Sequence, residues 1–255
     1  GTKTSKGSES TGVIPFVKVV DAEMLAFSQG VTRRGSYAGY MHISHPEIEE
    51  FLDIRKPTGG DTNRKCLNLH HGVVIPDKFM EVIHRATKEE GFDDSWELID
   101  PHSNEVKKVV SARALWVKLL QNRMETGEPY VMYEDAVNAE LPQFQKEKGL
   151  YVNHSNLCSE ITLATNDERT AVCCLSSVNL EYYDEWSKVP AFIPDLIRML
   201  DNVLTYFIDN APTQMEKARF SAYRERSIGL GAMGFHAYLQ KNMIAFESIH
   251  AAAVN

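Results

Sequence analysis

Strand-like and helix-like segments alternate along this chain, and the alternation constrains the fold more than any other feature. Short apolar runs between turn residues predict strands at residues 37–43, 67–75, 129–133 and 171–180. Apolar residues at helical spacing predict helices at residues 13–27, 111–125 and 192–207. The apolar stripe of the last helix is expected to face the core. Strands that alternate with helices favour an α/β fold.

Local signals predict where several elements begin and end. Ser111 is expected to cap a long helix that ends at Gly127, with Met124 among its inward residues. A short helix is expected after Pro46, and residues 95–104 are predicted to form a hairpin.

Length and composition describe an ordinary globular chain. Its 255 residues, 43% of them hydrophobic, suffice to bury roughly 70–75% of the unfolded surface, so a single α/β domain is the simplest expectation. A net charge of −8 argues against a general nucleic-acid binder. The sequence has no run of eighteen apolar residues, so we expect a cytoplasmic protein without a membrane partner. The chain begins without methionine and stops in a helix-like pattern, so we expect a piece of a longer protein.

The run 153–163 carries the most informative chemistry. Asn156, Cys158 and Glu160 stand at alternate positions, so in an extended chain they would share one face. A thiol can transfer a hydrogen atom or act as a nucleophile, a carboxylate can take a proton, and an amide can hold a hydroxyl. The alternative is an ordinary half-buried strand with Cys158 in the core. Further thiols follow at Cys173 and Cys174. Four cysteines in so long a chain are expected to be reduced thiols, unless they alternate between thiol and disulfide during a reaction.

This run, together with a second segment, carries a family resemblance. Ser-Asn-Leu-Cys-Ser-Glu-Ile at 155–161 and Cys-Cys-Leu-Ser-Ser-Val-Asn-Leu at 173–180 closely resemble the finger-loop and redox-cysteine segments of the ribonucleotide reductase large (catalytic) subunit. Agreement extends to Thr11–Phe16, Ser28–Gly30 and Ile228–Gly231. The resemblance implies part of a ten-stranded α/β barrel with the Cys158 loop threaded through its centre. It covers residues 1–255 but only the central to C-terminal portion of that barrel domain.

The resemblance also implies roles for individual residues. Cys158 would be the transient thiyl that abstracts the 3′ hydrogen, Glu160 would take the 3′-hydroxyl proton, and Asn156 would hold the substrate. Leu157 and Ser159 complete the substrate-binding stretch. Cys173 would be one of two thiols that oxidise to a disulfide, although the adjacent Cys174 leaves open which of the pair acts. The second redox thiol lies upstream in the family, outside this chain.

A basic loop at 28–36 has two interpretations. Glycines let a loop bend closely around a ligand, and paired guanidiniums favour phosphate or a base face, yet most such loops are merely solvated. The resemblance implies the mobile loop between effector nucleotide and substrate. Its residues would be Ser28, Gln29, Gly30, Arg33 and Arg34, although Val31 stands where the family commonly has a second glycine.

The implied activity is ribonucleoside-diphosphate reduction for DNA synthesis. This chain itself would bind no cofactor or metal: a metal-containing small subunit would supply the radical (class I), with adenosylcobalamin (class II) as the alternative. Partners would be ribonucleoside diphosphates, ATP and deoxynucleotide effectors, the remainder of the large subunit and a thioredoxin- or glutaredoxin-type reductant. A homodimer is expected, and the isolated piece should be inactive.

Other motifs favour weaker hypotheses. A cysteine hydrolase would need His154 as the base for Cys158, but four residues of extended chain separate them too widely. A catalytically incomplete nucleotide-binding fragment is a second alternative. The Gly-x-Gly-x-x-Gly run at 229–234 lacks the surrounding βαβ unit and is interpreted as close helix packing. The tandem His70–His71 would point to opposite faces of a strand, which argues against one shared metal ion.

Overall fold

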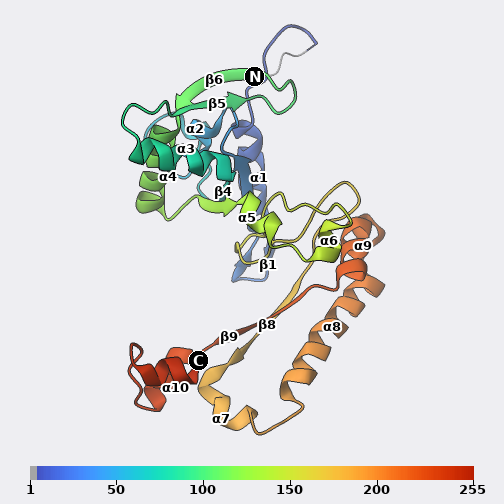
Figure 1. Ribbon diagram of the computed structural model, residues 1–255. Coiled ribbons are helices and arrows are strands. Elements are labelled where there is room, and N and C mark those ends of the chain that lie inside the picture. Colours follow the sequence, from blue (N-terminus) through green and yellow to red (C-terminus); the bar gives the residue numbers. More distant parts are fainter. Residues whose placement is uncertain (1–4) are drawn as a thin grey trace. The chain divides into compact units, whose positions relative to one another are not determined.

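The computed structural model describes residues 5–255. The chain forms two compact units, residues 1–162 and 163–255 (Figure 1).

A three-stranded parallel sheet forms the centre of the first unit. Its order is β3 (Ala38–His42), β4 (His70–Ile75) and β7 (Tyr130–Tyr133), with β4 in the middle. From His71 onward every residue of β4 is buried, because a central parallel strand is covered on both faces. The register aligns Tyr40 with Gly72 and Gly72 with Tyr130. These strands confirm the predictions for residues 37–43, 67–75 and 129–133.

The first unit also contains helices and two hairpins. The helices are α1 (Ile14–Ala26), α2 (Ile48–Phe51), α3 (Asp77–Lys88), α4 (Ala112–Thr126), α5 (Glu134–Ala139) and α6 (Gln143–Lys146), with a short 3₁₀ helix η1 (Thr62–Arg64). The hairpins are β1 (Ser28–Gln29) with β2 (Arg33–Arg34), and β5 (Ser95–Ile99) with β6 (Val106–Ser111). The predictions of a short helix after Pro46 and of a hairpin at residues 95–104 are therefore confirmed.

The ends of α4 follow the sequence signals. The Ser111 hydroxyl accepts a hydrogen bond from the Ala114 amide at 3.0 Å, and Gly127 ends the helix with φ of 80°, which favours glycine. Leu115 and Leu119 are buried as expected. Met124 is 90% exposed, so the prediction that it faces the core is wrong. On the last turn of a helix, a small angular offset is enough to place a residue outside the buried stripe.

One hydrophobic core joins the helices to the sheet in this unit. Phe79 of α3 is fully buried and makes edge-to-face contacts with Trp96 and Trp116 at ring-centroid distances of 5.0 and 6.4 Å. Phe51 and Ile75 belong to the same core. Aromatic pairs in this geometry add to the stabilisation that apolar burial provides.

The second unit is built on a parallel strand pair. Strand β8 (Cys174–Asn179) pairs with β9 (Ile228–Met233) in register from Cys174 with Ile228 to Asn179 with Met233. Around them lie η2 (Leu180–Tyr182), α7 (Tyr183–Trp186), α8 (Phe192–Asn210), η3 (Thr213–Met215), α9 (Glu216–Glu225), α10 (Phe235–Lys241) and α11 (Ile249–Val254). The strand at 171–180 and the helix at 192–207 are thus confirmed.

Two expectations for this unit need correction. The glycines at 229–234 lie in strand β9 and at its end, so their interpretation as helix packing is wrong. A Cβ atom on Gly229 would lie 2.8 Å from Cδ2 of Leu175, so this glycine makes room for a side chain of the paired strand. The apolar stripe of α8 is only partly core: Leu200 and Leu204 are buried, whereas Met199 and Val203 are about half exposed, at 46% and 48%.

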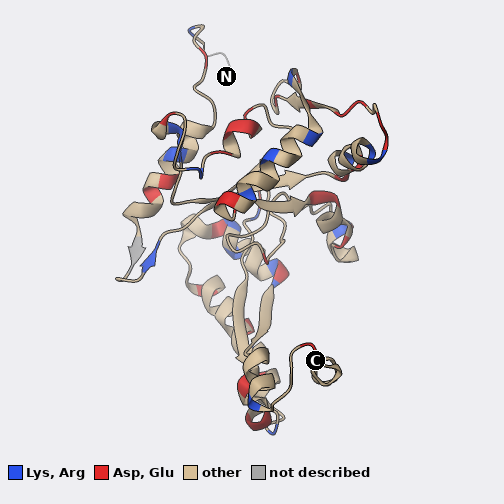
Figure 2. Ribbon diagram, turned by 90° about the vertical axis from the view of Figure 1, so that its left-hand side faces the viewer, with Lys and Arg blue, Asp and Glu red and all other residues tan. Residues whose placement is uncertain are grey.

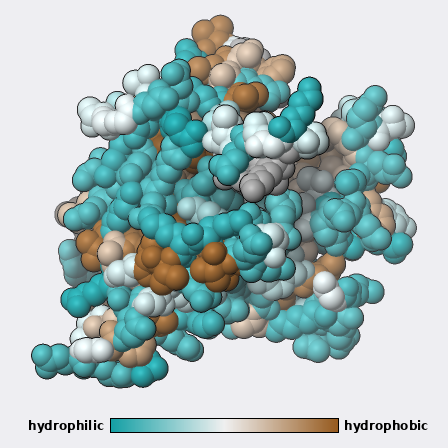
Figure 3. All heavy atoms as spheres, turned by 90° about the horizontal axis from the view of Figure 1, so that it is seen from above, coloured by the Kyte–Doolittle hydropathy of each residue, from teal (hydrophilic) through white to brown (hydrophobic). Residues whose placement is uncertain are grey.

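Charged residues of both signs are distributed over the helices and loops (Figure 2). Hydrophobic side chains on the face seen in Figure 3 gather in small patches between hydrophilic ones. Among the residues described, no helix has both the length and the apolar character needed to span a membrane.

Candidate active site

Cys158 lies in a tight turn that Asn156 closes. The backbone amide of Asn156 donates to the Ile161 carbonyl at 3.0 Å, and the backbone amide of Ile161 donates to the side-chain Oδ1 of Asn156 at 3.0 Å. The Ser159 amide donates to the Asn156 carbonyl at 3.2 Å. Backbone and side chain of one asparagine therefore hold both ends of the turn.

The turn corrects the expectation of an extended run with Asn156, Cys158 and Glu160 on one face. Ser159 has φ of 71°, in the left-handed region, which breaks the alternation of an extended chain. The physical reason is that an asparagine side chain can hydrogen-bond the nearby backbone and so compete with strand formation. Cys158 and Glu160 are exposed in this arrangement, so Cys158 is not a core residue.

The turn also defines what Asn156 can offer a ligand. Its Oδ1 atom already accepts from Ile161. The Nδ2 hydrogens are therefore the donors through which this side chain would hold a hydroxyl.

Residues just before the turn anchor it to the sheet. The buried Ser155 hydroxyl donates to the Asn156 carbonyl at 3.0 Å and also forms a short hydrogen bond with the Tyr40 hydroxyl of β3. The Tyr40 ring stacks with His154 at a centroid distance of 6.0 Å. His154 Nδ1 donates to the Ser155 carbonyl at 3.0 Å, so this nitrogen helps to hold the segment.

The four cysteines, all within the described residues, occupy different environments. Cys158 is exposed, whereas Cys66 is fully buried, and burial raises the pKa of the Cys66 thiol to about 11. Cys173 and Cys174 are half-buried, and burial raises the pKa of Cys174. Of these four residues, Cys158 is the one that is exposed.

The predicted redox cysteine lies in the other compact unit. Cys173 directly precedes β8, and its Sγ is 3.7 Å from the Cys174 carbonyl. Cys174 is the first residue of β8, and its amide donates to the Ser227 carbonyl at 3.3 Å. The encounter of Cys158 with Cys173 stays a prediction.

The predicted effector loop forms a small antiparallel hairpin. Ser28 pairs with Arg34 and Gln29 with Arg33, and Gly30, with φ of 73°, begins the turn between the strands. Arg33 and Arg34 are exposed and form the blue strand of this hairpin in Figure 2. The side chains of Ser28 and Gln29 lie outside the described part of the structure, so their role as readers stays a prediction.

Comparison with known proteins identifies the family. Residues 1–255 match the family described as "Ribonucleotide reductase, barrel domain". The chain belongs to this family. The resemblance seen in the sequence and the predicted α/β barrel class are confirmed.

Individual relatives agree with the family assignment. The chain is 52% identical over 247 residues to the putative ribonucleoside-diphosphate reductase large subunit of Frog virus 3, covering 96% of this chain and 42% of that protein. It is 43% identical over 294 residues to the large subunit of Invertebrate iridescent virus 3, covering 97% of this chain and 46% of that protein. The alpha subunit of the Actinobacillus ureae class Id ribonucleotide reductase aligns with a TM-score of 0.76 and 34% identity, covering 98% of this chain and 42% of that one. The chain thus spans less than half the length of these relatives.

The sequence alone did not point to a buried carboxylate in the first unit, that of Glu128. The Glu128 carboxylate accepts a short hydrogen bond from Nδ1 of His70. It also accepts hydrogen bonds from the backbone amide and from Nδ1 of His71, each at 3.1 Å. Nε of Arg55 lies 3.6 Å from this carboxylate. Burial alone would raise the pKa of Glu128, but the two histidine hydrogen bonds and Arg55 outweigh it and lower the pKa to about 2. The tandem histidines therefore share a carboxylate. No signal local to 70–71 points to Glu128.

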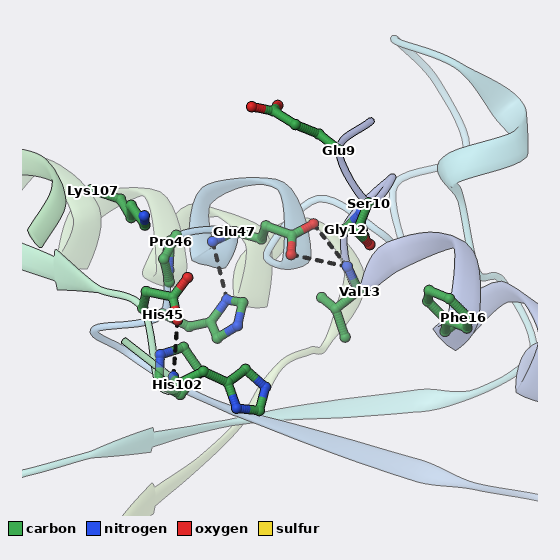
Figure 4. A pocket seen from close by; sticks show the side chains of 12 residues that line it. Glu9, Ser10, Gly12, Val13, Phe16, His45, Pro46, Glu47, His102 and Lys107 are labelled. Carbon is green, nitrogen blue, oxygen red and sulfur yellow. Dashed lines mark hydrogen bonds between the residues drawn. The ribbon is translucent and has the colours of Figure 1, made fainter. Parts of the chain in front are cut away.

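The described residues contain no metal-binding cluster. Within residues 5–255, no three His, Cys, Asp or Glu side chains are grouped to hold a metal ion. A pocket of about 490 Å³ lies beside the start of α1 (Figure 4). There the Glu47 carboxylate accepts hydrogen bonds from the Val13 amide at 2.9 and 3.0 Å, so it caps the start of α1. No cysteine lines this pocket.

Proposed function

We propose that residues 1–255 are the central to C-terminal part of the barrel domain of a ribonucleoside-diphosphate reductase catalytic subunit. Family membership and the names of the viral large subunits support this proposal. The carrying observation is the exposed Cys158 on a turn whose two ends are closed by Asn156. An isolated piece of the large subunit would not turn over, so the activity belongs to the complete subunit.

The chemistry uses the thiol as a hydrogen-atom carrier. Cys158, as a transient thiyl, takes the 3′ hydrogen of the ribose, Glu160 accepts the 3′-hydroxyl proton, and the Asn156 Nδ2 group holds the substrate. The 2′ hydroxyl leaves as water when a thiol protonates it, and the 3′ hydrogen then returns to the sugar. Two thiols, Cys173 and one outside this chain, become a disulfide and supply the two electrons. Leu157 and Ser159 line the same substrate stretch.

The partners follow from this chemistry. A metal-containing small subunit would supply the radical, which the class Id relative supports, and adenosylcobalamin remains the alternative source. A thioredoxin- or glutaredoxin-type protein would reduce the disulfide after each turnover. Ribonucleoside diphosphates are the substrates, ATP and deoxynucleotides the effectors, and a homodimer in the cytoplasm the working form.

A single-turnover experiment on the complete enzyme tests this function. Pre-reduced enzyme with its radical source and a ribonucleoside diphosphate, but without external reductant, is expected to form deoxynucleotide while two thiols are lost. Cys173→Ser should abolish disulfide formation and multiple turnover. Cys174→Ser, the adjacent control, should keep both because Cys173 is the redox thiol in this proposal.

The readouts are deoxynucleotide yield and thiols counted before and after the reaction. The opposite ranking of the two variants would transfer the redox role to Cys174. Absence of deoxynucleotide with every radical source, despite nucleotide binding, would favour the binding-fragment alternative. Activity that requires adenosylcobalamin would contradict the small-subunit assignment.

The hairpin at residues 28–34 is proposed to relay effector identity to substrate choice. Its arginines are exposed beside a glycine turn that can adopt alternative backbone conformations. Arg33→Ala and Arg34→Ala are expected to weaken the coupling between effector and base preference by about 5- to 150-fold, with a smaller effect on the intrinsic rate. Arg113→Ala, at an exposed position on α4, is the control.

Competition among several ribonucleoside diphosphates, with and without each deoxynucleotide effector, measures this coupling. An unchanged substrate ranking in both variants would mean that the hairpin is only a connector.

A further inference from the structure

The first unit has a row of three residues across its sheet beneath the Cys158 turn. Tyr40 of β3 is in register with Gly72 of β4, which is in register with Tyr130 of β7. Residues in register on neighbouring parallel strands point to the same face. The row therefore presents two tyrosines with a gap between them where glycine has no side chain.

The gap at Gly72 is filled by the Tyr40 ring. A Cβ atom on Gly72 would lie 2.3 Å from Cε1 of Tyr40 and 2.7 Å from its Cδ1, closer than real contacts allow. Gly72 has an ordinary strand conformation, so the glycine is required for space and not for backbone freedom. The Tyr40 ring can lie across the sheet only because residue 72 lacks a side chain.

The hydroxyl of that ring begins a directed chain of hydrogen bonds. The single hydroxyl hydrogen of Ser155 is donated to the Asn156 carbonyl at 3.0 Å, so the Tyr40 hydroxyl must donate to Ser155 Oγ. The Asn156 carbonyl also accepts from the Ser159 amide at 3.2 Å. Tyr40 is thus linked through one buried serine to the carbonyl that holds the turn around Cys158.

The third residue of the row, Tyr130, interacts electrostatically with the thiol. The pKa of Tyr130 is raised first by burial and then by electrostatic interaction with Glu128, Tyr40 and Cys158. Cys158 is therefore within electrostatic range of the third residue in the row.

We propose that Tyr40, Gly72 and Ser155 form a brace that positions the Cys158 turn over the sheet. The brace is a structural inference, and its catalytic consequence rests on the proposed reductase function. Hydrogen-atom transfer requires the sulfur close to one carbon atom, and displacement by about 1 Å can cost on the order of 100-fold in rate. Tyr40 and Ser155 are positioning residues, since they act through the turn.

The test uses the complete enzyme with Tyr40→Phe, which removes only the hydroxyl, and Ser155→Ala. Tyr37→Phe, a conservative change at an exposed tyrosine beside the same strand, is the control. Loss of a buried hydrogen bond is expected to speed amide hydrogen exchange at Ser159 and Ile161 by about tenfold. The kcat should fall by roughly 10- to 100-fold with KM within about threefold, because binding groups are retained.

A double variant distinguishes a brace from two independent effects. Tyr40→Phe with Ser155→Ala should be no worse than the more severe single change, because both break one chain of hydrogen bonds. Gly72→Ala should reproduce the effects of Tyr40→Phe if the variant folds. The comparison of the two single variants with the double variant does not depend on that result. Unchanged exchange in both single variants, or unchanged kcat despite faster exchange, would overturn the proposed positioning role. Faster exchange in an enzyme without any reductase activity would support the brace and overturn the reductase function.

Discussion

Replacement of Cys158 by serine in the complete enzyme is expected to abolish nucleotide reduction, by on the order of 10⁴-fold or more, and to leave nucleotide binding nearly intact. A serine O–H bond is much stronger than a thiol S–H bond, so serine cannot carry the hydrogen atom. The two side chains are close in size, and residue 158 is exposed on the turn, so the fold should not change. Deoxynucleotide formation and equilibrium nucleotide binding measure the two quantities.

Cys66→Ala is the matched control for this prediction. Cys66 is fully buried, so its replacement should lower stability without removing the reaction. Reduction by the Cys158→Ser enzyme at more than a few per cent of the wild-type rate would refute the assignment of Cys158 as hydrogen-atom carrier.

Acid is expected to destabilise the first unit through Glu128. Because the folded-state pKa is lowered from 4.5 to about 2, the ionised carboxylate stabilises the fold at every pH above the unfolded-state value. That stabilisation should disappear as pH falls from about 4.5 to about 2. A shift of this size corresponds to about 3 kcal/mol of unfolding free energy.

Glu128→Gln isolates this contribution because glutamine has nearly the same size and no charge. Urea unfolding at neutral pH should show a loss of about 2–3 kcal/mol, and the difference from wild type should shrink toward pH 2. Glu89→Gln, at an exposed glutamate paired with Arg85, is the control and should change little. A wild-type minus Glu128→Gln difference that stays constant from pH 7 to pH 2.5 would contradict the assigned pKa.

Much of the fold could be predicted from local sequence, and the candidate site residues came from a sequence motif. Helical spacing predicted α1 and α4, and Ser111 and Gly127 marked the ends of α4, because caps and amphipathic stripes depend on residues within a few positions of each other. The family motif singled out Asn156, Cys158 and Glu160. Those residues lie in one turn, in which Cys158 and Glu160 are exposed.

Tertiary structure decided how those residues are held. Period-two alternation predicted one shared face for the run, but the Asn156 side chain bonds the backbone five residues on and forms a turn. The contact of Tyr40 with Ser155 spans 115 residues of sequence, and those of Glu128 with His70 and His71 span 58 and 57. Contacts at such separation leave no periodic signal, because they arise only when strands from distant parts of the chain pack side by side. The residue types of the motif can be read from a short stretch of sequence, whereas the positions of their side chains depend on contacts with distant strands.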